Sequence, residues 1–193
     1  MSDLLLIFIS ASLVNNLVLH HLIGAGAGIG LSRKIDVAAG LCLVTAVVIG
    51  VATPVTHAVH QALFRAQGSD HFQLLAFMLV ILGIVLFGAA ALARLRPDWD
   101  GRYRAFVPLV LANSAVLGAA LLNAGQHYGL AGSLFYGLGA AAGFAVVVIP
   151  VAALHERLLA ADLPRPFRDS AALLLALGIL SMAFMGFTGI PGP

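Results

Sequence analysis

The sequence predicts an all-α polytopic membrane protein with six transmembrane helices, arranged as a 3+3 inverted-topology repeat in which helices 1 and 4 are interrupted. Three observations support this: an apolar composition, six apolar runs, and basic residues concentrated on one side. Hydrophobic residues make up 61% of the 193 residues, charged residues 9%, and the mean hydropathy is +1.04. Because a soluble domain carries about a quarter charged residues, this chain lacks the polar surface that water requires.

Six runs can span a bilayer, which takes about 20 apolar residues. They cover roughly residues 4–23, 37–63, 72–95, 104–124, 130–154 and 170–190. We expect all six to be helices, because an open strand leaves backbone groups unsatisfied in lipid. The connecting loops are too short for a soluble domain. We therefore expect one integral membrane domain, residues 1–193, with repeats of about 1–97 and 98–193.

The basic residues set the predicted orientation. Nine of the ten lie in the loops after helices 1, 3 and 5: Arg33, Lys34, Arg94, Arg96, Arg102, Arg104, Arg157, Arg165 and Arg168. The opposite side holds only Arg65. By the positive-inside bias, these three loops are cytoplasmic. We expect a multi-pass protein of the bacterial inner membrane with both termini periplasmic.

Two short polar patterns interrupt the first and fourth apolar runs. Asn15 and Asn16 lie in the first, and about 98 residues later Asn113 and Ser114 lie in the fourth. Aligning Asn15 with Asn113 superposes Asn16 on Ser114. Because each half has an odd number of helices, the second half enters from the opposite side. Interrupted helices in an inverted repeat place functional groups near the bilayer midplane.

Few other residues suggest catalysis, metal binding or an ion pathway. The interiors of the six spans lack Asp, Glu, Lys and Arg, the usual components of ion pathways. The midplane polar residues Asn15, Asn16 and Asn113 serve either as hydrogen-bonding contacts between helices or as a central site. A lone cysteine, Cys42, excludes an internal disulfide. We expect no metal ligand and no catalytic residue. His20 and His21 fall near the predicted cytoplasmic end of helix 1.

Several motifs resemble one family along the whole chain. They are residues 13–19 (LVNNLVL), 115–123 (AVLGAALLN), 155–158 (HERL), 166–168 (PFR) and 181–189 (SMAFMGFTG). This pattern is similar to the A subunit of the Rnf ion-translocating ferredoxin:NAD oxidoreductase and to its relative NqrE of the sodium-pumping quinone reductase. The C-terminal ending favours the A subunit over its sister E subunit.

The resemblance implies a redox site that this sequence does not reproduce. Family members pair with a sister RnfE-like subunit of opposite topology, and the two subunits hold a 2Fe-2S cluster with two cysteines each. In this chain those ligand positions correspond to Gly26 and Ser114. Glycine has no ligating side chain, and serine is a poor substitute for a thiolate. We predict no cofactor from this chain alone, while FMN, FAD and Fe-S are expected in the partner subunits, which are RnfB-, RnfC-, RnfD- and RnfG-like.

The function implied is that of an integral subunit of a redox-driven translocase, which couples electron transfer between ferredoxin and NAD to Na⁺ or H⁺ transport. Such a subunit would not be catalytic alone, and its partners include membrane lipid but no nucleic acid. The missing cysteines leave two explanations: a cluster that is absent or differently ligated, or a paralogue that keeps only the scaffold. Two alternatives stay open, a small inverted-repeat secondary transporter and a non-redox membrane scaffold. Neighbouring genes for iron–sulfur, NADH-binding and flavin subunits would favour the pump.

Overall fold

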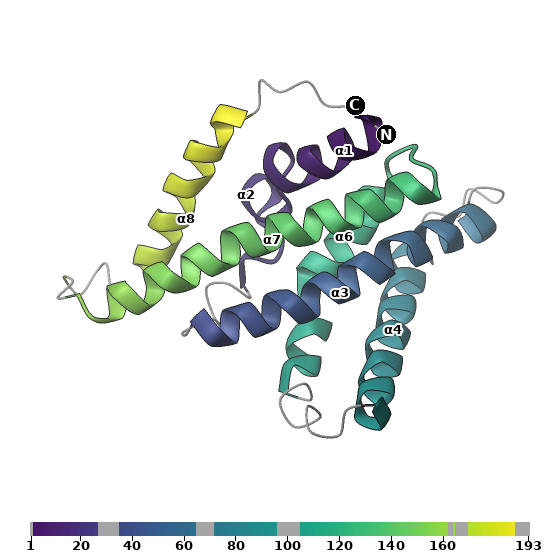
Figure 1. The fold of residues 1–193 in the computed structure, drawn as a ribbon, viewed down its shortest axis with the longest axis horizontal. Helices are drawn as coiled ribbons and strands as arrows, with labels where there is room; N and C mark the ends of the chain where they lie inside the picture. The colour runs from purple at the N-terminus through teal and green to yellow at the C-terminus, as the bar shows by residue number, and fades with distance from the viewer. Residues whose placement is uncertain are drawn as a thin grey trace.

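A computed structural model describes residues 2–26, 35–64, 72–95, 105–161, 164 and 170–187. All regular structure in these ranges is helical, which confirms the predicted all-α class (Figure 1). The helices are α1 (Ser2–Ile9), α2 (Leu17–His21), α3 (Ile35–Val59), α4 (Gln73–Leu95), Ala105–Leu111, α6 (Ser114–Ala124), α7 (Leu130–Leu159) and α8 (Ser170–Phe184). Short π- or 3-10-helical turns extend α1, α3 and α8: η1 (Ser10–Val14), η3 (His60–Phe64) and η6 (Met185–Phe187).

The helices differ in how far they could reach across a bilayer. Three stretches of the described chain are long and apolar enough to cross alone: Ile35–Leu63, Gln73–Arg94 and Leu130–Leu159. Ala105–Leu111 and Ser114–Ala124 form a pair bent by 42°, which counts as a fourth crossing if taken together. Asp3–Val14 and Ala171–Phe187 are shorter. The predicted interruptions of the first and fourth runs are both present.

The centre of the molecule is the packing of α3 against α7 (Figure 1). The two helices are antiparallel: the Glu156 carboxylate accepts from the Ile35 N–H at 2.9 Å at one end, while Gly137 faces Thr53 further along. Glycines on α7 allow close approach, because a Cβ at Gly139 or Gly143 would collide with the backbone of α1 and η1. Small residues serve the same purpose in other membrane helix pairs.

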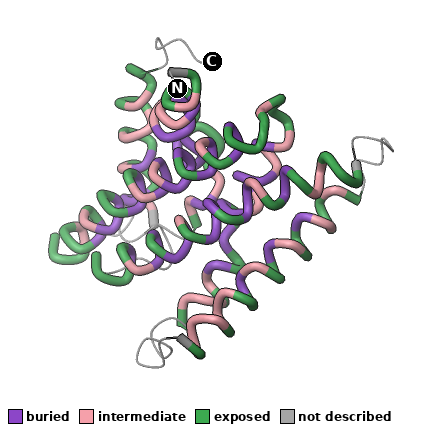
Figure 2. Tube along the Cα trace, turned by 45° about the vertical axis from the view of Figure 1, so that its right-hand side comes forward, coloured by how far each residue is buried: buried purple, intermediate pink, exposed green. Residues whose placement is uncertain are grey.

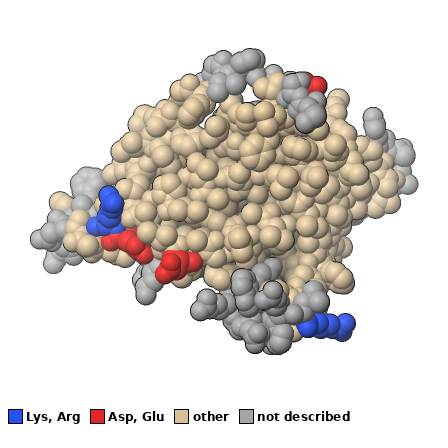
Figure 3. Space-filling model, viewed as in Figure 1, with Lys and Arg blue, Asp and Glu red and all other residues tan. Residues whose placement is uncertain are grey.

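Burial is greatest where α1, α3, α6 and α7 meet, and the outer surfaces of the helices are exposed (Figure 2). The exposed side chains of α4 are mainly large and apolar, for example Leu79 and Phe87. One face of the molecule carries charge only toward its margins (Figure 3). An uncharged apolar surface of this kind suits contact with lipid.

Most of the basic residues that predict the orientation lie outside the described residues. Arg94, at the end of α4, and Arg157, in the last turn of α7, are described. Outside are Arg33, Lys34, Arg65, Arg96, Arg102, Arg104, Arg165 and Arg168. The predicted orientation therefore stays a prediction.

Candidate functional site at two helix breaks

The first break is organised by Asn16, which is 1% exposed. The chain leaves η1 through a π-turn, in which the Asn15 N–H donates to the Ser10 carbonyl at 2.7 Å. The Asn16 side-chain oxygen then caps α2 by accepting from the N–H groups of Val18 and Leu19 at 3.0 and 3.3 Å. Such a cap satisfies donors that a helix start leaves free.

The side-chain amide nitrogen of Asn16 donates two further hydrogen bonds, neither of them to α2. It donates to the Ser12 carbonyl at 2.7 Å and to the Gly143 carbonyl of α7 at 3.0 Å. One side chain therefore caps α2, holds the preceding turn and joins both to α7. Every polar atom of this buried amide has a partner, as a group in a low-dielectric interior requires.

The second break is organised in the same way by Asn113. Its side-chain oxygen caps α6 by accepting from the Ala115 N–H at 3.0 Å. Its amide nitrogen lies 3.5 Å from the Thr45 hydroxyl of α3, a long contact. Asn113 thus corresponds to Asn16, and the alignment of Asn15 with Asn113 is off by one residue. The reason is that the capping position, and not the first polar residue, defines the start of each helix.

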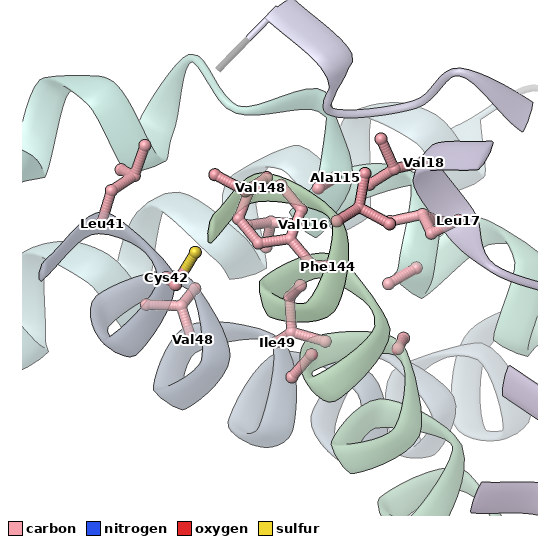
Figure 4. Close-up of a cluster of buried hydrophobic side chains, with 14 of the residues drawn as sticks. Leu17, Val18, Leu41, Cys42, Val48, Ile49, Ala115, Val116, Phe144 and Val148 are labelled. Atoms are coloured by element: carbon pink, nitrogen blue, oxygen red, sulfur yellow. The ribbon is translucent and has the colours of Figure 1, made fainter. Parts of the chain in front are cut away.

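The two breaks contact each other through the chain that follows α2. The Gly24 N–H donates to the Ser114 hydroxyl at 2.9 Å. Gly24 has a φ of +83°, and a Cβ there would lie 2.7 Å from Ala115 Cβ and 3.0 Å from Phe144 Cε2. Only glycine meets both demands, because other L-residues avoid this conformation. Figure 4 shows how the apolar residues after each break, Leu17 and Val18 on one side and Ala115 and Val116 on the other, gather around Phe144.

The predicted site residues differ in how far they are exposed. Asn16 and Asn113 are buried, whereas Asn15, Gly26 and Ser114 are exposed. The Asn15 amide donates to the Ser10 hydroxyl at 3.2 Å, within its own segment. The structure brings the two breaks into contact, and one asparagine of each break is buried.

Asn123 is a buried polar residue that the sequence interpretation passed over. It is fully buried in the last turn of α6, and its amide donates to the Thr53 carbonyl of α3 at 3.4 Å. The signal that could have identified it is a second asparagine within the same apolar run as Asn113. A polar side chain in such a run needs a partner on a neighbouring helix.

Comparison with known proteins decides the family. The family described as "Rnf-Nqr subunit, membrane protein" matches residues 4–191. The chain belongs to this Rnf-Nqr family. Proteins named as the A subunit of an ion-translocating oxidoreductase complex, from Yersinia pseudotuberculosis and Yersinia pestis, are each 40% identical to it over 190 residues, covering 98% of both chains. The protein of that name from Thioalkalivibrio sulfidiphilus is 38% identical over 190 residues, or 98% of this chain and 99% of its own.

The residues at the breaks of this Rnf-Nqr chain do not fit an iron–sulfur cluster. The Ser114 hydroxyl already accepts from Gly24, and Gly26 offers no side chain. Cys42 is buried in α3 and lies among apolar side chains (Figure 4). Within the described residues, no group of three or more His, Cys, Asp or Glu could hold a metal ion. Thiolates hold these clusters, and this chain presents none at the breaks.

Substitutions of Gly24 and Gly26 distinguish the effect of the contact between the two breaks from the effect of any change in the chain that follows α2. We expect Gly24→Ala to lower the thermal unfolding midpoint by several degrees, because it adds both a strained φ and a clash with Ala115. Gly26→Ala is the matched control, since a Cβ there meets no atom of the described residues within 4 Å. The measurement is unfolding of the detergent-solubilised chain. Equal midpoints for the two variants would contradict the contact.

Proposed function

We propose that this chain is the A-type membrane subunit of an ion-translocating electron transport complex, which couples electron transfer between ferredoxin and NAD to Na⁺ or H⁺ transport. The observation that carries the proposal is the 40% identity, over 98% of both chains, to proteins named as the A subunit of an ion-translocating oxidoreductase complex. The apolar helices, and the face in Figure 3 that carries charge only toward its margins, suit a subunit that lies in the membrane.

The proposed architecture is six spans in two inverted repeats, in the inner membrane, with periplasmic termini. Its support is the equivalence of the two breaks. Each is capped by an asparagine, and each amide turns toward the long helix of the other half: Asn16 to Gly143 and Asn113 to Thr45. Gly143 and Thr45 are 98 residues apart, close to the 97 residues that separate Asn16 from Asn113. Such reciprocal contacts are what two repeats related by a pseudo-two-fold axis would make.

A sister membrane subunit is the proposed partner at the breaks. Asn15 and Ser114 are both exposed beside them. Each has one hydrogen-bond partner within the chain, Ser10 for Asn15 and Gly24 for Ser114, but lipid would supply no further partners to their exposed surfaces. A second subunit that covers this face would supply them. RnfB-, RnfC-, RnfD- and RnfG-like subunits, with FMN, FAD and Fe-S groups, complete the proposed complex.

We propose further that this chain contributes no ligand to a 2Fe-2S cluster. Its support is that neither ligand position of the family resemblance offers a thiolate: Gly26 has no side chain, and the Ser114 hydroxyl accepts a hydrogen bond from the Gly24 N–H. The electrons would then pass through a differently ligated centre or by another route. No step of electron transfer is assigned to residues of this chain.

Purification of the tagged chain from its own membranes in mild detergent tests both proposals. We expect a second Rnf-Nqr family subunit, together with iron–sulfur and flavoprotein subunits, to co-purify and to be identified by mass spectrometry. Acid-labile sulfide in the isolated pair of membrane subunits should fall below one 2Fe-2S cluster per pair. An unrelated tagged membrane protein controls for detergent-stable contaminants.

Different results would contradict the proposed complex and the proposed lack of a cluster ligand. A chain that purifies alone, and that moves a solute when placed in liposomes, would contradict the complex and favour a small transporter. A full complement of acid-labile sulfide in the pair would leave the complex intact but contradict the absence of a cluster ligand.

A further inference from the structure

A cavity of about 350 Å³ lies between α4 and the second helix break. One wall consists of five apolar residues within 75–82 of α4, and the other consists of Leu111, Asn113, Val116 and Leu117. Eight of the nine lining residues are apolar. The ninth, Asn113, is buried, and its side chain is already hydrogen-bonded within the chain. Mainly apolar pockets of about 300–1,000 Å³ are the usual binding sites of small ligands.

A much smaller cavity lies at the equivalent place beside the first break. It measures about 30 Å³ and is formed between that break and α8. Four residues of the first break line it, and each lies 97 residues before a lining residue of the larger cavity: Val14, Asn16, Leu19 and His20 correspond to Leu111, Asn113, Val116 and Leu117. The two cavities are therefore related by the repeat, although their volumes differ more than ten-fold.

The side chains of α8 account for the small size of the cavity at the first break. The Ser181 hydroxyl donates to the Leu19 carbonyl at 3.1 Å, which holds α8 against the break. Phe184 and Met185 line the space that is left. The side chains of α4 do not fill the corresponding space at the second break. Because side chains that line an unfilled space lose dispersion contacts, an apolar molecule that entered it would be stabilised.

The larger cavity is continuous with a surface that suits lipid. Leu75, Met78, Leu79 and Leu82 line the cavity and are also exposed on the outside of α4. Their helix is long and apolar enough to cross a bilayer alone. The hydrocarbon of the membrane therefore reaches the cavity directly from the side of α4.

The dimensions of the cavity favour a single hydrocarbon chain over a helix of another protein. One turn of a helix, about 10–12 Å wide with its side chains and about 5.4 Å long, takes up roughly 400–600 Å³. The cavity holds less than that. Its lining residues extend over about 10 Å of α4 at about 1.5 Å per residue. This length lies within the half of an about 30 Å hydrocarbon core that the chains of one leaflet fill.

We propose that one acyl chain of a membrane phospholipid binds between α4 and the second break. It fills the space that corresponds to the one closed by α8 at the first break. The bound chain adds packing contacts to α4, which otherwise contacts mainly α3 and α6. The inference requires a membrane protein, which the family establishes, and it does not depend on the partner subunits of the proposed function.

The test follows phospholipid that stays with the purified protein. Cells that express the tagged chain are grown with a diazirine-bearing palmitic acid, which enters the acyl chains of their phospholipids. The chain, with whatever co-purifies, is washed thoroughly in mild detergent, irradiated and digested with chymotrypsin. We expect adducts with the mass of an intact phospholipid, concentrated on residues 75–82 and 111–117, because detergent replaces lipid first on the open surface.

Two variants fill the cavity from its opposite walls, Leu82→Trp on α4 and Leu111→Trp at the break. Each should lower the adduct yield at the cavity roughly five-fold or more, equivalent to about 1 kcal/mol of binding free energy, while the chain still accumulates in membranes. Leu174→Trp is the matched control, since Leu174 is exposed on α8 and lines neither cavity. It should keep the wild-type yield.

Three results would overturn the lipid site: adducts spread evenly over the exposed helices, adducts of free fatty acid alone, or an undiminished yield in both cavity-filling variants. A wild-type chain without adducts at the cavity would also overturn it, as expected if a side chain of another subunit fills the space. The proposed function is tested separately, by the identity of the subunits that co-purify.

Discussion

Asn16→Leu should destabilise the chain by about 3 kcal/mol or more. Leucine removes the cap on Val18 and Leu19, which alone is worth about 1 kcal/mol. It also leaves the Ser12 and Gly143 carbonyls without the amide donor. Each buried polar group that loses its partner costs about 1–3 kcal/mol. The measurement is thermal unfolding of the detergent-solubilised chain, followed by circular dichroism.

Asn15→Leu is the matched control, because Asn15 is adjacent and exposed, and among the described residues it is hydrogen-bonded only to Ser10 of its own segment. It should change the unfolding midpoint of the isolated chain little. Asn16→Asp should be at least as damaging as Asn16→Leu, since a carboxylate keeps the capping acceptor but sets a buried oxygen against the Ser12 and Gly143 carbonyl oxygens. The assignment of Asn16 as the structural member of the pair fails if Asn15→Leu is the more damaging substitution.

Gly143→Val is expected to have the second large effect, through packing. A Cβ at this position would lie 2.7 Å from the Ser12 carbonyl oxygen and 2.8 Å from the Asn16 amide nitrogen. Both the α7 backbone and the η1 backbone would have to move, and the Asn16 hydrogen bond to Gly143 would be lost with them. Overpacking of a filled interior typically costs about 1–3 kcal/mol, and the lost hydrogen bonds add to it. We expect poor accumulation in membranes and a much lower unfolding midpoint.

Gly178→Val provides the control for the effect of valine itself on a membrane helix. Gly178 lies in α8, and a Cβ there meets nothing within 4 Å. This variant should accumulate and unfold as the wild type does. If both valine variants behaved alike, close approach between η1 and α7 would not be the reason that position 143 is glycine.

The helices and their interruptions could be predicted from the sequence, because they depend on residues that are close together in the chain. An apolar composition in runs of about 20 residues predicts membrane helices, and the described residues of those runs are helical apart from residues 15–16, 22–23 and 112–113. The interruptions of the first and fourth runs were also predicted, since an asparagine in an apolar run favours a helix start through its own side chain. The lack of thiolates at Gly26 and Ser114 needs no structure at all.

The tertiary structure decided which polar residues are buried. The sequence could not choose between Asn15 and Asn16, because either can cap a helix. Asn16 is the buried one since its amide reaches Gly143, 127 residues away. The position of the segment around α2 likewise follows from its contacts with α6, α7 and α8. The sequence by itself therefore determined the helices, their breaks and the missing ligands, whereas only long-range packing determined which side chains meet at the centre.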